Sequence, residues 1–198
     1  QKSDVAKDRT AQLHLEAVGF NGANPATHRV VLYPSIAEME SWTKKFQASD
    51  AGSEFTNAIN SIATPVAQYM EQPLKSWGTV SNDDKIFDVV RMQVSDPAAT
   101  LAGLEELMSA PESKDFPGQI WLIQVMRGNA APDGRVTHQI VVGYESLTEM
   151  EAWSDYMVTT KAWQKWTSIP QNSFVVTNRF YVDWLVGYDH NYTLEDFD

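Results

Sequence analysis

The feature that most constrains the fold of this chain is an internal repeat. Residues 27–42 read THRVVLYPSIAEMESW, and residues 137–153 read THQIVVGYESLTEMEAW. When Gly143 is treated as a single insertion, nine of the sixteen aligned positions are identical. A match of this length between distant segments indicates two copies of one structural unit, so we expect the chain to fold as a duplication.

Each copy of the repeat predicts a strand followed by a helix. The segments THRVVLY and THQIVVGY are runs of β-branched and aliphatic residues, which is typical of strands. The segments that follow place apolar residues three or four positions apart, on one side of a helix: Ile36, Met39, Trp42 and Phe46 in the first copy, and Leu147, Met150, Trp153 and Met157 in the second. A Ser before each helix, with a Glu three residues later, matches the capping-box pattern.

The segments around the repeat predict further strands in both copies. Residues 11–20 and 119–128 are strand-like, and each is joined to the repeated strand by a short loop rich in Asn, Pro and Gly, which favours a hairpin. After the helices, PVAQYM and FVVTNRFYVDW predict the strand that closes each unit.

The second copy has one more piece at its start. Residues 85–94 predict a strand, and residues 95–110 predict a helix with Pro97 near its first turn. Residues 85–185 therefore follow the order strand-helix-strand-strand-helix-strand, which is the order of a ferredoxin-like unit. Only ten residues precede the first copy, which is too few for this strand and helix.

The sequence thus predicts an α+β fold with two ferredoxin-like units in tandem. Residues 1–78 form the first unit, which lacks its initial strand and helix, and residues 79–198 form a complete unit with an acidic C-terminal tail. The segment SWGTVSNDD, residues 76–84, is the expected link between them.

This element order and its duplication resemble the dimeric α/β-barrel superfamily, which includes antibiotic-biosynthesis-monooxygenase-like, haem-degrading, EthD-like and NIPSNAP-like proteins. The resemblance covers most of the chain. It implies that the two antiparallel sheets pair into a barrel within one chain, as a pseudo-dimer that can remain a monomer. It also implies that a ligand lies between a sheet and its helices.

Two histidines occupy the same position of the repeat. His28 and His138 begin the repeated strands, on the aliphatic face that we expect to pack under the helices. An imidazole there could be a general base, an axial haem ligand or a hydrogen-bond anchor. Alternatively, both are structural residues that bond a neighbouring carbonyl group.

Aromatic residues supply the other candidates for ligand binding. Trp42 and Trp153 lie on the inward stripes of their helices, where they form either core or the wall of a pocket. Tyr144 ends its strand and could orient a substrate or belong to the barrel interface. Trp166 is part of an aromatic cluster in the second unit, so we expect that unit to have the better-formed pocket.

Composition argues against several partners and sites. Fifteen basic and twenty-six acidic residues give a net charge of −11, which argues against nucleic acid and anionic membrane as partners. The absence of Cys excludes disulfides, thiolate metal sites and cysteine nucleophiles. The sequence has no phosphate-binding glycine loop, no G-x-S-x-G and no H-E-x-x-H, so no metal site is predicted.

The chain starts at Gln1 and not at Met. This start is expected of a mature product after removal of a signal peptide, which would place the protein in the periplasm or outside the cell. A chain shortened at its N-terminus for another reason would also start at Gln1. In that case a cytoplasmic location is expected.

These observations predict a protein that holds a small, largely apolar or aromatic molecule between sheet and helices. The alternative is a cofactor-independent or haem-using monooxygenase-like enzyme, which the resemblance implies. A structural or assembly role for the fused barrel is the third hypothesis. Haem is the one cofactor that these hypotheses leave open.

Overall fold

A computed structural model describes residues 11–19, 28–32, 35–79, 83–128, 135–169 and 173–188. Its elements in chain order are β1 Ala11–Gly19, β2 His28–Leu32, α1 Ile36–Gln47, α2 Asp50–Ile62, β3 Tyr69–Gly78, β4 Ile86–Val94, α3 Pro97–Ser109, the short 3₁₀ helix η1 Pro111–Ser113, β5 Gln119–Gly128, β6 His138–Tyr144, α4 Leu147–Val158, α5 Lys161–Thr167 and β7 Phe174–Tyr188. The predicted order of strands and helices is confirmed in both halves. Each half also has a second helix after the repeat, α2 in the first and α5 in the second.

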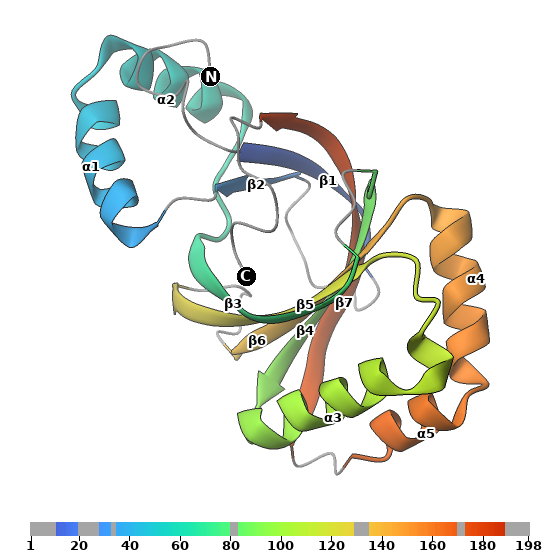
Figure 1. Ribbon diagram of the computed structural model, residues 1–198. Helices are drawn as coiled ribbons and strands as arrows, with labels where there is room; N and C mark the ends of the chain where they lie inside the picture. Colours follow the sequence, from blue (N-terminus) through green and yellow to red (C-terminus); the bar gives the residue numbers. More distant parts are fainter. Residues whose placement is uncertain are drawn as a thin grey trace.

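The strands form one antiparallel sheet in the order β2-β1-β7-β4-β6-β5-β3 (Figure 1). The four strands of the second half lie together in the middle, as β7-β4-β6-β5. Strands of the first half continue the sheet on both sides, because β1 pairs with β7 and β3 pairs with β5. The sheet is strongly curved, so it has a concave face and a convex face (Figure 1).

Helices α3, α4 and α5 cover the convex face, where the main hydrophobic core lies (Figure 1). Side chains alternate between the faces along a strand, so Met92 of β4 and Leu122 of β5 point to this core and are almost fully buried. Val89, Phe180 and Val182 form a smaller core on the concave face.

Side-chain caps explain where the helices begin. The capping box predicted at Ser35 is present: its hydroxyl accepts from the amide of Glu38 at 3.2 Å, and the Glu38 carboxylate accepts from the Ser35 amide at 2.9 Å. Ser146 caps α4 in the same way, but the carboxylate of Glu149 accepts from the amide of Glu145 instead. No helix in the described part of the chain is long and apolar enough to cross a membrane.

The repeated helices do not cover equivalent surfaces, contrary to what the repeat predicts. Helix α4 packs against β6 and α5, whereas α1 packs mainly against α2 (Figure 1). As a result Val30 of β2 is 61% exposed, while Ile140 at the equivalent position of β6 is 8% exposed. The described first half has no counterpart of α3, whose Leu104 and Leu107 belong to the same core as Ile140 of β6. Among the described residues, the aliphatic side chains of β2 are therefore more exposed than those of β6.

Candidate functional site

His138 lies at the start of β6, opposite Met92 of β4 and Gln124 of β5. It faces the helix-covered convex side, and only 4% of it is exposed. Its Nδ1 lies 3.0 Å from the hydroxyl oxygen of Thr137, while its Nε2 is buried without a hydrogen-bond partner among the described residues. Of the two histidines predicted as candidate bases, His138 is the one whose buried Nε2 has no hydrogen-bond partner among the described residues.

The hydroxyl group of Thr137 lies beside the His138 imidazole. It accepts from the amide of Val94 at 2.8 Å and lies 3.5 Å from the carbonyl oxygen of Met92. Two arrangements fit its 3.0 Å contact with Nδ1: Nδ1–H donates to the hydroxyl, which leaves Nε2 with a lone pair, or the hydroxyl donates to Nδ1. Burial lowers the pKa of His138, so the ring is neutral at neutral pH.

Tyr144 ends β6 on the same face as His138. It is buried and packs edge-to-face on Phe116, with ring centres 6.0 Å apart. Burial, together with the nearby Asp88 carboxylate, raises the pKa of Tyr144, so its phenol stays protonated. Asp88 is itself paired with Arg179, whose Nη2 donates to Asp88 Oδ2 at 2.6 Å and whose Nε donates to Oδ1 at 3.1 Å.

Trp153 and Trp166, the two tryptophans predicted as ligand-binding residues in the second half, lie on its helices α4 and α5. Trp153 of α4 lies 5.2 Å from Phe116, measured between ring centres, and is half-buried. Trp166 of α5 is buried and stacks on Phe174 at 5.2 Å. Both belong to the convex-face core, which also contains Tyr144.

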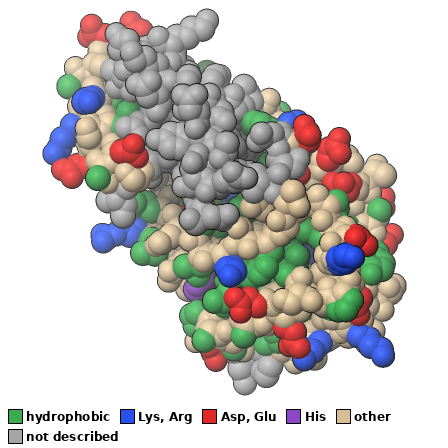
Figure 2. Space-filling view, viewed as in Figure 1, with side chains coloured by type: hydrophobic (Ala, Val, Ile, Leu, Met, Phe, Trp, Pro, Cys, Tyr) green, Lys and Arg blue, Asp and Glu red, His purple; other side chains and the backbone are tan. Residues whose placement is uncertain are grey.

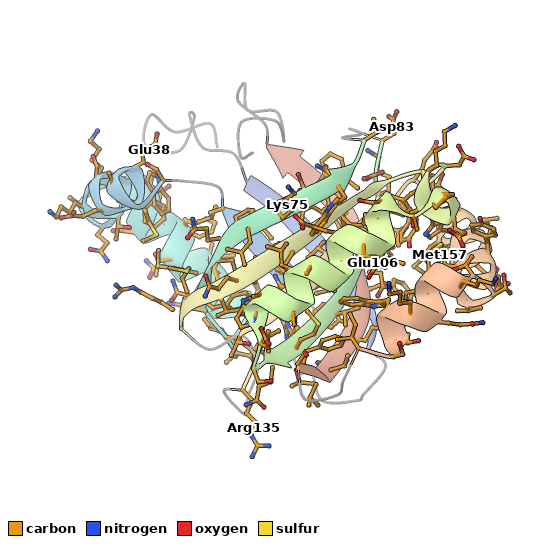
Figure 3. All side chains as sticks on the ribbon, turned by 60° about the horizontal axis from the view of Figure 1, so that its bottom comes forward. Glu38, Lys75, Asp83, Glu106, Arg135 and Met157 are labelled. Carbon is orange, nitrogen blue, oxygen red and sulfur yellow. The ribbon has the colours of Figure 1, made fainter. Side chains whose placement is uncertain are left out.

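A groove of about 300 Å³ lies between α3 and α5. Trp166 and Leu107 supply apolar surface to it, and an ion pair between Glu106 of α3 and Lys165 of α5 crosses it. Figure 3 shows Glu106 on the side of α3 that is nearer α5. The two helices approach closely at Gly103, where an added Cβ would lie 2.2 Å from a methyl carbon of Ile169.

The remaining predicted residues lie elsewhere. His28 is exposed at the start of β2, so the aliphatic face predicted to be covered is open in the first unit. Trp42 is half-buried on α1, where it stacks on Phe46 at 4.8 Å. The structure therefore places His138, Tyr144, Trp153 and Trp166 on one face of the sheet, with His138 and Tyr144 at opposite ends of β6, and leaves His28 and Trp42 apart from them.

Sequence reasoning missed a buried carboxyl group at the start of β4. Asp84 is 4% exposed, and its Oδ2 has no hydrogen-bond partner in the described part of the chain. A Cβ added at Gly143 would lie 2.3 Å from this oxygen, so any larger residue at this insertion would force the Asp84 carboxylate to move. Burial, reinforced by the carboxylate of Glu149, raises the pKa of Asp84 to about 6.

It also missed polar residues on the concave face. Arg91 of β4 and Gln139 of β6 are opposite each other in the ladder and almost fully buried. Gln139 donates to the carboxylate of Glu71, and Arg91 donates to the hydroxyl of Tyr69 at 3.1 Å. The alternation in HQIVVGY puts Gln139 opposite to the histidine face, but its partners depend on a strand register that the sequence does not reveal.

His138, the candidate axial ligand for haem, is enclosed by the convex-face packing, and the groove between α3 and α5 is lined by other residues. No three His, Asp or Glu side chains in the described ranges are grouped to hold a metal ion. Acidic and basic side chains are interspersed on the face drawn in Figure 2, in keeping with the absence of a concentrated positive charge in the sequence.

No family model and no curated protein matches the chain. Solved structures do match it. An anthrone oxidase-like protein has a TM-score of 0.55 at 10% identity, with 94% of this chain and 81% of that chain covered. A candidate monooxygenase from Fusobacterium nucleatum has a TM-score of 0.55 at 12% identity, with the same coverage of 94% and 81%. Another from Lactobacillus acidophilus has a TM-score of 0.51 at 12% identity, with 91% and 77% covered.

At this level of identity the comparisons establish the fold alone. The chain has an α+β fold of the ferredoxin type, as expected from the resemblance to antibiotic-biosynthesis-monooxygenase-like proteins. Activity has to be argued from the site itself.

Proposed function

We propose that this chain is a monooxygenase-like enzyme that oxidises an aromatic small molecule on the convex face of its second half. The observation that carries this proposal is the buried, neutral imidazole of His138, whose Nε2 has no partner among the described residues. The fold shared with candidate monooxygenases supports it, and the anthrone oxidase-like neighbour suggests a fused aromatic substrate with an acidic C–H bond.

In this proposal His138 is the general base. This role requires the tautomer that is protonated at Nδ1. Nε2 then takes a proton from the substrate, and the Thr137 hydroxyl accepts from Nδ1–H of the imidazolium that forms. Oxygen then reacts with the electron-rich carbanion. For a CH₂ group the overall change is oxidation to C=O, with one atom of O₂ in the product and the other released as water with the two hydrogens.

Substrate must open the packing beside His138, because the imidazole is closed off from solvent. Tyr144, Phe116 and Trp153 lie at the other end of β6, about 20 Å from His138, so they do not contact the same small substrate.

The test uses anthrone as a probe and measures oxygen uptake together with the absorbance of the quinone product. His138→Gln should lower the rate by about 10²- to 10⁴-fold, the usual contribution of a general base. His28→Gln is the matched variant, because it changes the equivalent residue of the repeat at an exposed position; it should retain the wild-type rate. Oxygen uptake no faster than in buffer would refute the reaction for this substrate, and an active His138→Gln would refute the role of the base.

A second candidate function is binding of an apolar or aromatic ligand without chemistry. It is favoured by the groove between α3 and α5, where Trp166 and Leu107 lie beneath a charged rim. Quenching of tryptophan fluorescence by anthrone, with no oxygen uptake and with loss of quenching in Trp166→Leu, would support this function over oxidation.

We further infer that the two halves are a tandem duplication that takes the place of a dimer. The nine identities in the repeat and the symmetric pairing of β1 with β7 and of β3 with β5 support this inference. If it holds, residues 79–198 produced alone should form a dimer through β5 and β7 in sedimentation experiments. A well-folded monomer would contradict it.

A further inference from the structure

The repeated strand is open in the first half and covered in the second. Val30 and Leu32 of β2 lie on one face of their strand, and both are exposed. At the equivalent positions of β6, Ile140 is buried in the convex-face core and Val142 packs against that core. The same aliphatic face is therefore buried in one copy and exposed to solvent in the other.

Helix α1 carries the surface that would match this face. None of its described side chains, residues 37–47, is buried. Phe46 of its apolar stripe is half-buried, whereas Met157 at the equivalent position of α4 is buried in the convex-face core. A helix of this length depends mainly on the packing of its apolar face for stability. The chain thus contains both surfaces of the contact that α4 and β6 make, but keeps them apart.

Helices α1 and α2 hold together as one unit. The ring centres of Phe46 and Phe55 lie 5.8 Å apart, edge to face, and Gly52 of α2 is buried against the backbone of Phe46. The pair lies to one side of the sheet, on the opposite side of the molecule from α4 and α5 (Figures 1 and 3). Phe55 remains exposed, so the pair has apolar surface available for another contact.

The connection from the repeated strand to the repeated helix differs between the two copies. The first copy is one residue shorter, because it has no counterpart of Gly143, and Pro34 stands where the second copy has Glu145. Proline fixes its own φ and restricts the residue before it to extended conformations. A shorter and stiffer connection disfavours packing of α1 on its own β2. Short connections of this kind promote exchange of an element between two copies of a chain.

We propose that two copies of this chain exchange their α1–α2 pairs, so that α1 of each copy packs on β2 of the other. The apolar stripe of α1 then covers Val30 and Leu32, as α4 covers β6 within the second half. Two such contacts about one twofold axis give a closed dimer. The pairing of β1 with β7 and of β3 with β5 stays within each chain, so the exchange depends neither on the duplication nor on the oxidation proposed above.

Sedimentation velocity of the full chain at micromolar concentrations tests the proposal, and the wild type should sediment as a dimer. Val30→Asp places a charge in the proposed contact, at a position that is exposed in the single chain. It should weaken dimerisation by about tenfold or more. Val175→Asp is the matched control, because it adds the same charge at a similarly exposed valine of β7; it should remain dimeric.

A second variant tests the connection. A glycine inserted after Leu32, together with Pro34→Glu, gives the first copy the connection of the second. Helix α1 can then fold back on its own strand, so this variant should be a monomer with the circular dichroism spectrum of the wild type. A variant that stays fully dimeric would overturn the role of the connection.

Disulfide formation shows whether the contact is between chains, because the natural sequence has no Cys. The full chain carrying both Val30→Cys and Met39→Cys is oxidised and run on a denaturing gel without reductant. These positions match Ile140 and Met150, which share the convex-face core. A band at twice the mass of the chain is expected. A band at the mass of a single chain would overturn the exchange.

A monomeric wild type would overturn the proposal, and so would a dimer that Val30→Asp leaves intact. If circular dichroism shows that Val30→Asp is unfolded, Leu32→Asp decides instead, because Leu32 is the next exposed residue on the same face of β2. Wild-type dimerisation in that variant would overturn the proposal in the same way.

Discussion

Replacing Asp84 by Asn should make the protein more stable at neutral pH. Asp84 is buried, its Oδ2 has no partner among the described residues, and the carboxylate of Glu149 adds a repulsive charge. The ionised form is therefore disfavoured in the folded chain compared with the unfolded chain, where water surrounds the carboxylate. Asn keeps the shape of the side chain and removes its charge.

The size of the effect follows from the pKa. The pKa of Asp84 rises from an ordinary 3.8 to about 6 on folding, and each pH unit corresponds to about 1.4 kcal/mol. Because the pKa of Asp84 is higher in the folded chain than in the unfolded chain, protonation of Asp84 stabilises the fold. This contribution is fully present below pH 3.8 and is lost as the pH rises through about 6. At pH 7 to 8 the wild type should therefore be less stable than Asp84→Asn by up to about 3 kcal/mol.

The assay is urea unfolding of both proteins between about pH 4 and pH 8, with the free energy of unfolding compared at each pH. The difference between them should grow with pH through the interval from 3.8 to about 6 and then level off. Asp155→Asn, which removes an exposed carboxyl group of α4, controls for the change in net charge. If the difference in the free energy of unfolding between the wild type and Asp84→Asn stays constant from about pH 4 to pH 8, the raised pKa of Asp84 is refuted.

Other substitutions test the packing and the ion pair on the sheet. Gly143→Ala places a Cβ against the Asp84 carboxylate, so it should lower the free energy of unfolding by about 1–3 kcal/mol in the same urea assay. Arg179→Met should lower the free energy of unfolding by about 2–3 kcal/mol, because it leaves the buried carboxylate of Asp88 without its partner. Solvent at the half-exposed arginine keeps the loss in this range. An unchanged free energy of unfolding in Arg179→Met would refute the contribution of this ion pair. Trp153→Ala should lower the free energy of unfolding by about 3–5 kcal/mol, because Trp153 packs against the core. Trp42→Ala should lower it clearly less, because Trp42 packs within the α1–α2 pair. Equal losses in the two variants would contradict the different placements of the two helices.

Most of the element order could be predicted, because it depends on local periodicity. The repeat, the capping serines and the alternation along the strands can each be recognised within a few residues of sequence. The helices begin where Ser35 and Ser146 indicate. The placement of α1 could not be predicted in this way. An apolar stripe indicates that a helix covers something, but not which surface is present to be covered.

The candidate site was predictable to a similar extent. The parity of β6 puts His138 on the helix-covered face, as expected from the sequence, and puts Tyr144 on the same face, which the sequence left open. The raised pKa of Asp84 and the hydrogen bonds of Arg91 and Gln139 on the concave face depend on contacts between segments that are far apart in the sequence. Such contacts depend on the register of paired strands, which cannot be predicted from a single sequence.

The sheet order has a consequence for synthesis on the ribosome. β1 can pair with β7 only after nearly the whole described chain has been made, because Ala11 is opposite Tyr188. β3 must likewise wait for β5. During translation the early strands and the α1–α2 pair therefore emerge without their partners, and native pairing is mostly non-local. We expect the nascent chain to depend on chaperones until its last strand is released.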